Sequence, residues 1–387
     1  MTASMSMIPR AAAISIYDLL EHAAKVTTGQ DVVLIAHTDG LYGGDNLVDL
    51  AAISWIQTAI QLRGANASVL WIDEPAELHA WKFPGVVKAA MKAADVSILH
   101  SFDITFEEIV ELKQFVFNEN IRLIRNFATT APLLCTDWAQ TPHELVSAIR
   151  YQAALLIVDG ADWQLSDPNG THLQGKIQPA LNENHPWFPR YAITREEGHG
   201  YIPWPEWVVP PIRLDDTNGV FVFDCMLSWW SRYIGISPCF SDPIRLNVTD
   251  GKITEIQGGR EAEALREFLS SMQQRLGEGV YDFNCLHFGV HPQASVLPHV
   301  CPNVLYRRMI EHSHSSNLHA HIGAPAPTAD YPYWVHCTGD IRQPTFKVGD
   351  TLILDDGHLT VLDSPVVKEI ADKYPDRPGL GAEPQHG

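Results

Sequence analysis

Several signatures of common enzyme classes are missing from this chain of 387 residues. It has no G-x-G-x-x-G dinucleotide fingerprint and no phosphate-binding P-loop. It also lacks the G-x-S-x-G elbow that presents a nucleophilic serine. The glycine-containing segment TDGLYGGD at residues 38–45 predicts a tight turn between a strand and a helix. Dinucleotide chemistry, P-loop chemistry and serine acyl transfer therefore have no support.

Positive charge is scarce. Lys and Arg together number 27 against 46 Asp and Glu, which gives a formal net charge of −19. Such a surface repels phosphate backbones and gains nothing from an anionic lipid surface. We expect neither nucleic acid nor a membrane as a partner.

Long apolar runs and paired cysteines are also lacking. No run is long enough to span a bilayer, and the N-terminus reaches Asp18 and Glu21 without a signal-peptide core. The six cysteines form no C-x-x-C pair, which in a chain of this size indicates reduced thiols. We expect a cytoplasmic protein.

The length and a hydrophobic fraction of 45% indicate a globular protein of two or three domains. Over residues 1–140, apolar strand-like runs alternate with helical patterns. The expected strands are 31–37, 67–73, 96–101 and 121–127, and the expected helices are 46–64, 84–94 and 106–118. This alternation predicts an α/β domain with a mostly parallel, Rossmann-like sheet. His37, Asp39 and His100 would lie at the carboxyl ends of its strands, where such sheets bind ligands.

The pattern of expected secondary structure changes after a helix expected at 143–157. Residues 161–177 alternate around Asp-Pro-Asn-Gly, which predicts a β-hairpin. Short β-like segments follow, interrupted by one helix at 259–276. We predict an α+β domain with antiparallel strands over residues 141–370 that carries a metal site, followed by a tail at 371–387.

Histidine is abundant in this chain, whereas the motifs of several common enzyme classes are missing. Of 18 histidines, eight lie between residues 287 and 336. Seven of the eight occur in CLHFGVHP (285–292), EHSHSSNLHAHIGAP (311–325) and VHCTGD (335–340), and the eighth is His299. Imidazole and carboxylate ligands suit Fe(II), Zn(II) or Mn(II), and two histidines with one carboxylate are typical of non-haem Fe(II) oxygenases.

The candidate metal ligands are His291, His319, His336 and Asp340. His319 and His321 alternate along a strand and would share one face, so one could bind the metal and the other lie beside it. Which member of each pair, His319 or His321 and His336 or Asp340, binds directly stays open.

Other residues have different expected roles. His312 and His314 stand in a polar Ser/His run, which favours exposure to solvent. Glu206, between prolines and tryptophans, would be costly to bury without a partner and is a candidate catalytic residue. Trp204 and Trp207 beside it could form an aromatic wall, although plain packing is the simpler interpretation.

The order of several short motifs resembles the thermophilic aminopeptidase T metallopeptidase superfamily. The motifs that resemble this superfamily are IPWPEWVVPP (202–211), DPNGTHL (167–173), FGVHP (288–292), HAHIG (319–323) and VHCTGD (335–340). The likeness covers about residues 140–362. It implies a metal-dependent enzyme and a homo-oligomer.

The departures from the peptidase pattern are informative. The resemblance places Cys285 where a two-metal peptidase has a catalytic glutamate, and His291 where it has asparagine. A histidine at the Gly-x-His-Pro position is closer in pattern to 2,5-dihydroxypyridine 5,6-dioxygenases of the same superfamily. The stretched His-Cys-Thr-Gly-Asp is unlike both relatives.

The resemblance favours a mononuclear Fe(II), extradiol-type dioxygenase that opens a hydroxylated N-heteroaromatic ring with O₂. Its ligands would be His291, His319 and Asp340, with His336 as a fourth ligand or a neighbour of the metal. His100 and His321 are candidates for proton transfer, and Glu206 for orienting substrate.

Two alternatives remain. A Zn- or Mn-dependent hydrolase, either an aminopeptidase or an amidohydrolase, would use Glu206 as general base. A non-catalytic protein with a degenerate metal site is the third interpretation.

Overall fold

The computed structural model describes residues 8–38, 48–73, 84–100, 115–116, 118–179, 200–227, 230–231, 234–326, 328, 335 and 337–381. Two expected site residues, Asp39 and His336, lie outside these ranges, as does most of the helix expected at 106–118. None of the described helices is long and apolar enough to cross a bilayer.

The first sheet is parallel throughout, as the sequence predicts. Its five strands are ordered β2-β1-β3-β4-β7. Their bounds are β1 Asp31–Thr38, β2 Asn66–Asp73, β3 Val96–His100, β4 Arg122–Asn126 and β7 Gly200–Trp204. β3 is buried along its whole length, which explains its continuous apolar run.

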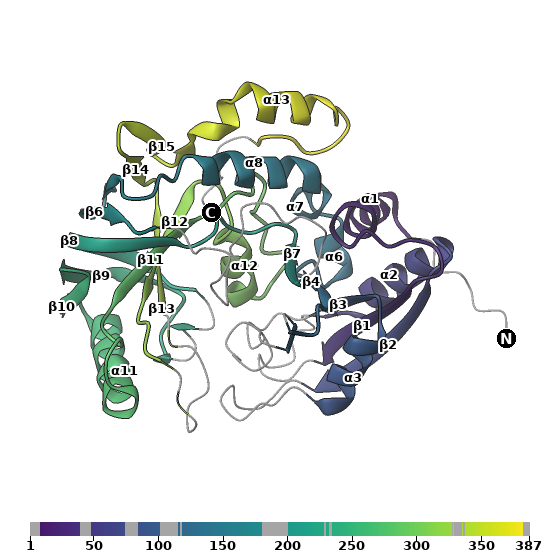
Figure 1. The fold of residues 1–387 in the computed structure, drawn as a ribbon, viewed down its shortest axis with the longest axis horizontal. Coiled ribbons are helices and arrows are strands. Elements are labelled where there is room, and N and C mark those ends of the chain that lie inside the picture. The colour runs from purple at the N-terminus through teal and green to yellow at the C-terminus, as the bar shows by residue number, and fades with distance from the viewer. Residues whose placement is uncertain are drawn as a thin grey trace.

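Helices accompany this sheet. They are α1 Arg10–Asp18, a π-helical turn at Leu19–Ala23, α2 Leu50–Leu62, α3 Gly85–Ala93, α6 Ala131–Leu134, α7 Asp137–Gln140 and α8 His143–Leu155. The last of them, α8, reaches toward the antiparallel strands, where it packs beside α13, Pro365–Asp372 (Figure 1). Asp49 caps α2 by accepting from the Ala52 amide and also accepts from the Ala131 amide, so one carboxylate joins α2 to α6.

The fifth strand of the parallel sheet comes from well beyond residue 140. β7 pairs with β4 from Arg122↔Gly200 to Asn126↔Trp204. The segment that carries Glu206 therefore begins at the carboxyl end of the parallel sheet. The domain boundary proposed at residue 140 stays a prediction.

The second sheet is antiparallel and carries the histidine-rich strands, as expected. The main strand order is β11-β12-β13-β8-β6-β5-β14-β15-β16, and β9 pairs with both β8 and β10. The bounds are β5 Asp162–Ser166, β6 His172–Ile177, β8 Ile212–Cys225, β9 Cys239–Thr249, β10 Lys252–Gln257, β11 Phe283–Phe288, β12 Asn317–Ile322, β13 Cys337–Arg342, β14 Thr345–Val348, β15 Thr351–Asp355 and β16 His358–Leu359. β5 and β6 form the predicted hairpin, in which Asp167 accepts from the Thr171 amide.

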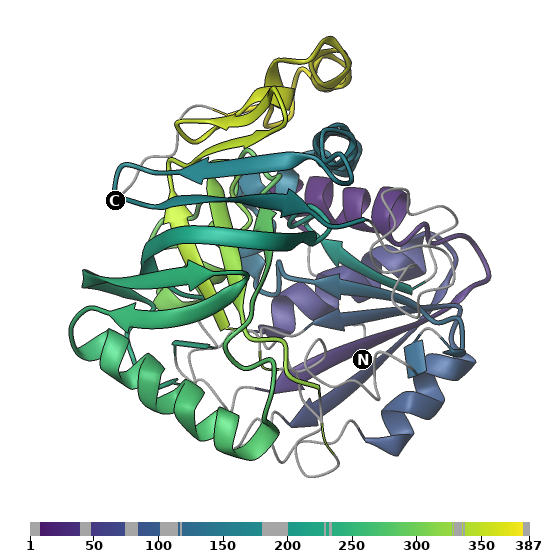
Figure 2. The same ribbon diagram turned by 60° about the vertical axis from the view of Figure 1, so that its left-hand side comes forward.

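Three helices and a 3₁₀ turn accompany this sheet. They are α11 Arg260–Leu276, α12 Val304–Glu311, the turn Thr360–Asp363 and α13 Pro365–Asp372. α11 is the helix predicted at 259–276. It buries Ala262, Leu265 and Leu269 on one stripe and lies along the outer side of the antiparallel strands (Figure 2).

Helix α12 connects the two sheets. The Tyr306 hydroxyl hydrogen-bonds to the Phe127 carbonyl, just beyond β4, and to the Thr129 hydroxyl. In Figure 1, α12 lies between the antiparallel strands and the β4–β7 edge of the parallel sheet. These hydrogen bonds hold the segment that follows α12 near the place where the two sheets meet.

Candidate metal centre

Strand register gathers polar side chains on one face of the antiparallel sheet. Cys285 pairs with His321 and His287 pairs with His319 between β11 and β12. His319 in turn pairs with Asp340 on β13. Because residues two apart on a strand point to the same face and paired residues are neighbours, these five side chains form a contiguous polar row.

The first set of possible metal ligands is His312, His319 and Asp340, here called the His-His-Asp group. One donor atom from each lies within 4.8 Å of the others. His312 Nδ1 is 3.0 Å from Asp340 Oδ2, and the ring centroids of His312 and His319 are 3.7 Å apart. His319 and Asp340 were predicted ligands, while His312 was not.

The turn after α12 delivers His312. The His291 amide donates to the Ser313 carbonyl at 3.0 Å, and the Ser315 amide donates to the His291 carbonyl at 3.2 Å. These bonds hold the turn against the segment that follows β11. The expectation that His312 and His314 face solvent is wrong, since they are only 3% and 6% exposed. The local sequence is polar, yet the segment is buried because its backbone hydrogen-bonds to His291.

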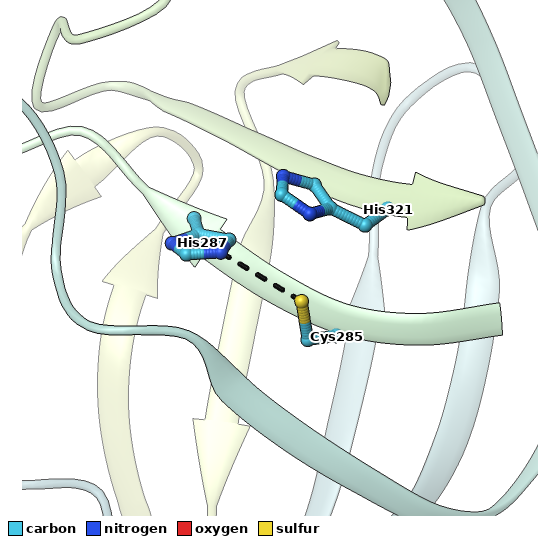
Figure 3. A group of neighbouring side chains, drawn as sticks. All are labelled: Cys285, His287 and His321. Carbon is cyan, nitrogen blue, oxygen red and sulfur yellow. Dashed lines mark hydrogen bonds between the residues drawn. The ribbon is translucent and has the colours of Figure 1, made fainter. Parts of the chain in front are cut away.

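The second set is Cys285, His287 and His321, here called the Cys-His-His group (Figure 3). Cys285 Sγ lies 3.7 Å from His287 Nε2, and the ring centroids of His287 and His321 are 4.7 Å apart. His287 Nδ1 is 3.0 Å from the Val209 carbonyl oxygen. The two groups are adjacent, because the parallel rings of His287 and His319 have centroids 5.0 Å apart.

His291 lies beside the groups without joining either of the two ligand sets found among the described residues. It is fully buried, its Nδ1 accepts from the Gln293 amide at 3.2 Å, and its ring centroid is 6.4 Å from that of Trp138. Burial lowers its pKa to about 3, so the imidazole is neutral at physiological pH.

Glu206 is buried next to Trp207 and opposite Arg150 of α8. Arg150 Nε lies 3.7 Å from Glu206 Oε1. The Trp207 ring centroid is 5.9 Å from that of His312 and 4.8 Å from that of Phe127. The Glu206–Trp207 segment therefore runs from the end of the parallel sheet to the His-His-Asp group.

His100 lies in the parallel sheet, at the end of β3. Asn126 Nδ2 donates to His100 Nδ1 at 2.8 Å, and complete burial lowers the pKa of His100 to about 3. A chain of neighbours leads from His100 through Asn126 and Phe127 to Trp207 and so to the metal groups.

The His-His-Asp group fits a metal ion. The Asp340 Oδ1 atom is buried and has no hydrogen-bond partner among the described residues. A buried carboxylate oxygen without a partner is costly unless a cation or a proton satisfies it. The imidazoles of His312 and His319 lie beside Asp340. Two imidazoles with one carboxylate form a donor set expected for a transition metal.

Sequence reasoning missed His312, and no local signal marks it. The Cys-His-His group did leave a signal. Cys285 and His287 alternate on one expected strand as His319 and His321 do on another, and pairing these strands would have suggested the cluster.

Comparisons with known proteins cover most of the chain. A model of the NicX family, 2,5-dihydroxypyridine 5,6-dioxygenase, matches residues 22–300. The matched segment includes Cys285 and His287 and ends before His312. No curated protein matches the sequence.

Two solved structures share the fold. The 2,5-dihydroxypyridine dioxygenase from Pseudomonas putida KT2440 superposes with a TM-score of 0.60 at 16% identity, covering 91% of this chain and 98% of that one. Wild-type AmpT from Thermus thermophilus gives a TM-score of 0.52 at 12% identity, covering 91% of this chain and 99% of that one. At these identities the similarity establishes the architecture alone.

Proposed function

Because the chain belongs to the 2,5-dihydroxypyridine 5,6-dioxygenase family, we propose that it is an Fe(II)-dependent dioxygenase that opens a hydroxylated N-heteroaromatic ring. The observation that carries this proposal is the His-His-Asp group, with its three donor atoms within 4.8 Å of one another. The substrate would be a small dihydroxypyridine-like compound, with O₂ as the second substrate.

His312, His319 and Asp340 would hold the iron. Two imidazoles and one carboxylate form the ligand set of non-haem Fe(II) oxygenases. When bound, iron in such a set supplies open coordination positions at which two reactants are brought together. This assignment replaces His291 of the sequence-based ligand set by His312, while His336 lies outside the described residues.

The surroundings of the group suit a flat, polarisable substrate. Trp207 packs edge-on against His312 and is itself held by Phe127. An aromatic side chain fixed in this way can support a planar ring while excluding water. We assign Trp207 to the wall of the substrate site.

The proposed proton-transfer role of His100 is not supported by its environment. A pKa of about 3 makes this imidazole a weak base that does not hold a proton at neutral pH. Its neutral ring is better suited to orient a group by hydrogen bonding. His321 is half-buried in the Cys-His-His group, beside His287.

A metal-dependent hydrolase is the second candidate, favoured by the fold similarity to AmpT and by the burial of Glu206. A hydrolytic Glu206 would need to accept a proton from water. Instead, the Glu206 carboxylate is paired with the Arg150 guanidinium, at 3.7 Å.

The test is metal analysis of anaerobically purified protein, combined with O₂ uptake on addition of 2,5-dihydroxypyridine. We expect one iron per chain and O₂ consumption that stops when the iron is chelated. Pyridine without hydroxyl groups serves as the control substrate. Zinc or manganese without O₂ uptake on any hydroxylated pyridine would move the hydrolase to first place.

A further inference from the structure

We propose that Cys285, His287 and His321 form a second metal site, beside the His-His-Asp group and chemically distinct from it. The site would bind a borderline cation such as Zn(II). This inference concerns the adjacent group and does not depend on the dioxygenase activity.

The three donors are positioned by paired strands rather than by loops. Cys285 and His287 lie two residues apart on β11, so they share a face, and His321 is the register partner of Cys285 on β12. One donor atom from each residue lies within 4.8 Å of the other two. In Figure 3, the Cys285 sulfur and the rings of His287 and His321 lie close together on one side of the two strands. Such a set needs little rearrangement to close around an ion.

The hydrogen bonding of His287 selects the tautomer that a metal ligand requires. A carbonyl oxygen only accepts, so the 3.0 Å contact with Val209 means that His287 Nδ1 carries the proton. In the neutral ring, Nε2 then carries the lone pair, and this is the atom that faces Cys285 Sγ at 3.7 Å. A backbone carbonyl that orients the far nitrogen is the usual support of a metal-binding histidine.

The sulfur distinguishes the two groups. The His-His-Asp group offers nitrogen and oxygen alone, whereas the Cys-His-His group adds a soft thiolate that favours zinc over harder cations. Three protein ligands leave a fourth position on zinc for water or another small ligand. Cys285 and His287 are buried and His321 is half-buried. The 5.0 Å separation of the His287 and His319 rings places the two sites side by side.

Metal binding at this site releases a proton. A thiol binds zinc as the thiolate, so Cys285 must give up its proton when it becomes a ligand. On binding, the S–H bond breaks, the proton passes to solvent and the sulfur lone pair forms the bond to zinc, with no change in oxidation state.

Cobalt(II) substitution tests the proposal, because a thiolate ligand gives an intense sulfur-to-cobalt absorption in the near ultraviolet that nitrogen and oxygen ligands lack. We expect this absorption in the cobalt-loaded full-length protein. Cys285→Ser should abolish it. Cys301→Ser is the matched control, because Cys301 is buried to the same degree, at 5% exposure against 4%, and belongs to neither group. It should keep the absorption.

Absence of the absorption from the wild type, or its survival in Cys285→Ser, would overturn the proposal. Should Cys285→Ser fail to fold, X-ray absorption of the zinc-loaded wild type decides, with a Zn–S distance of about 2.3 Å expected and no sulfur in the first shell as the contrary result. Loss of O₂ uptake with the sulfur signal intact would refute only the dioxygenase. The reverse pattern would refute only the second site.

Discussion

His312 Nδ1 lies 3.0 Å from Asp340 Oδ2, and this contact joins the end of α12 to strand β13. Because a carboxylate only accepts, Nδ1 is the protonated nitrogen and Nε2 of the neutral ring carries the lone pair. On the other side of the contact, Asp340 Oδ1 is the buried oxygen that has no partner among the described residues. His312 Nε2 and Asp340 Oδ1 are therefore the two donor atoms of this pair that the contact does not use.

The first prediction distinguishes the metal ligands that the structure indicates from those that the sequence predicted. His312→Ala should lower iron affinity at least about tenfold, because it removes a donor and the hydrogen bond that orients Asp340. His291→Ala should retain the iron, since His291 joins neither ligand set. Metal content after dialysis against a competing chelator measures both variants, with exposed His299→Ala as the control. Loss of iron in His291→Ala alone would restore the ligand set predicted from the sequence.

The second prediction concerns Gly289, which supports the turn that carries His312. A Cβ at residue 289 would lie 2.1 Å from the His314 carbonyl oxygen and 2.4 Å from the Ser313 carbonyl carbon. Backbone atoms cannot give way as a flexible side chain can, so Gly289→Ala should push the turn away and cost about 1–3 kcal/mol. Iron affinity should fall with it.

Urea unfolding and metal titration measure these two effects of Gly289→Ala. Gly379→Ala is the matched control, because a Cβ there meets nothing within 4 Å. Unchanged stability and iron binding in Gly289→Ala would contradict this account of how the turn is held.

The third prediction is a pH dependence of stability that arises from His100. Burial lowers its folded-state pKa to about 3, while the unfolded chain keeps the ordinary value of 6.5. Between these values the unfolded state binds more protons, so the free energy of unfolding is highest above pH 6.5 and falls as the pH drops toward 3. The contribution is at most about 1.4 kcal/mol per pH unit.

His100→Gln should flatten this dependence by about one proton. Urea unfolding of metal-free protein between pH 5 and pH 7 measures it, and removing the metal keeps ligand protonation out of the comparison. Equal slopes in the variant and the wild type would show that His100 does not contribute.

The fourth prediction concerns the buried pair of Arg150 and Glu206, whose nearest charged atoms are 3.7 Å apart. Glu206→Gln leaves the arginine charge buried without its carboxylate and should cost about 3 kcal/mol. The double variant Arg150→Met/Glu206→Leu should recover most of that loss, because neither charge is then buried. Thermal and urea unfolding of the three proteins make the comparison. A Glu206→Gln protein of normal stability but reduced kcat/KM would instead support the substrate-orienting role that the sequence suggested.

Much of the fold could be predicted because its signals are local. The strand at 31–37 is a continuous apolar run, the hairpin at 161–177 turns on Asp-Pro-Asn-Gly, and the helix at 259–276 has a clear apolar stripe. The structure places β1, the β5–β6 hairpin and α11 at these positions. Helix α1 was not expected from the sequence, and neither was the return of the chain to the parallel sheet at β7. β7 is five residues long, and it belongs to the parallel sheet because it pairs with β4, which is distant in the chain.

The candidate site was predictable only in part. Strand alternation correctly suggested that His319 and His321 belong to one neighbourhood, and β13 brings Asp340 opposite His319. The run around His312 indicated solvent because its own composition is polar, and only its contact with β13 reverses that interpretation.

The sequence by itself determined the classes of structure and the inventory of donors, because apolar periodicity, turn residues and histidine content are properties of short segments. Only the tertiary structure decided which donors meet. Register between β11, β12 and β13 separates the donors into a His-His-Asp group and a Cys-His-His group, and a turn after α12 supplies His312 in place of His291. The physical reason is that a metal site is defined within a few ångströms, whereas the contacts that set those distances join residues far apart along the chain.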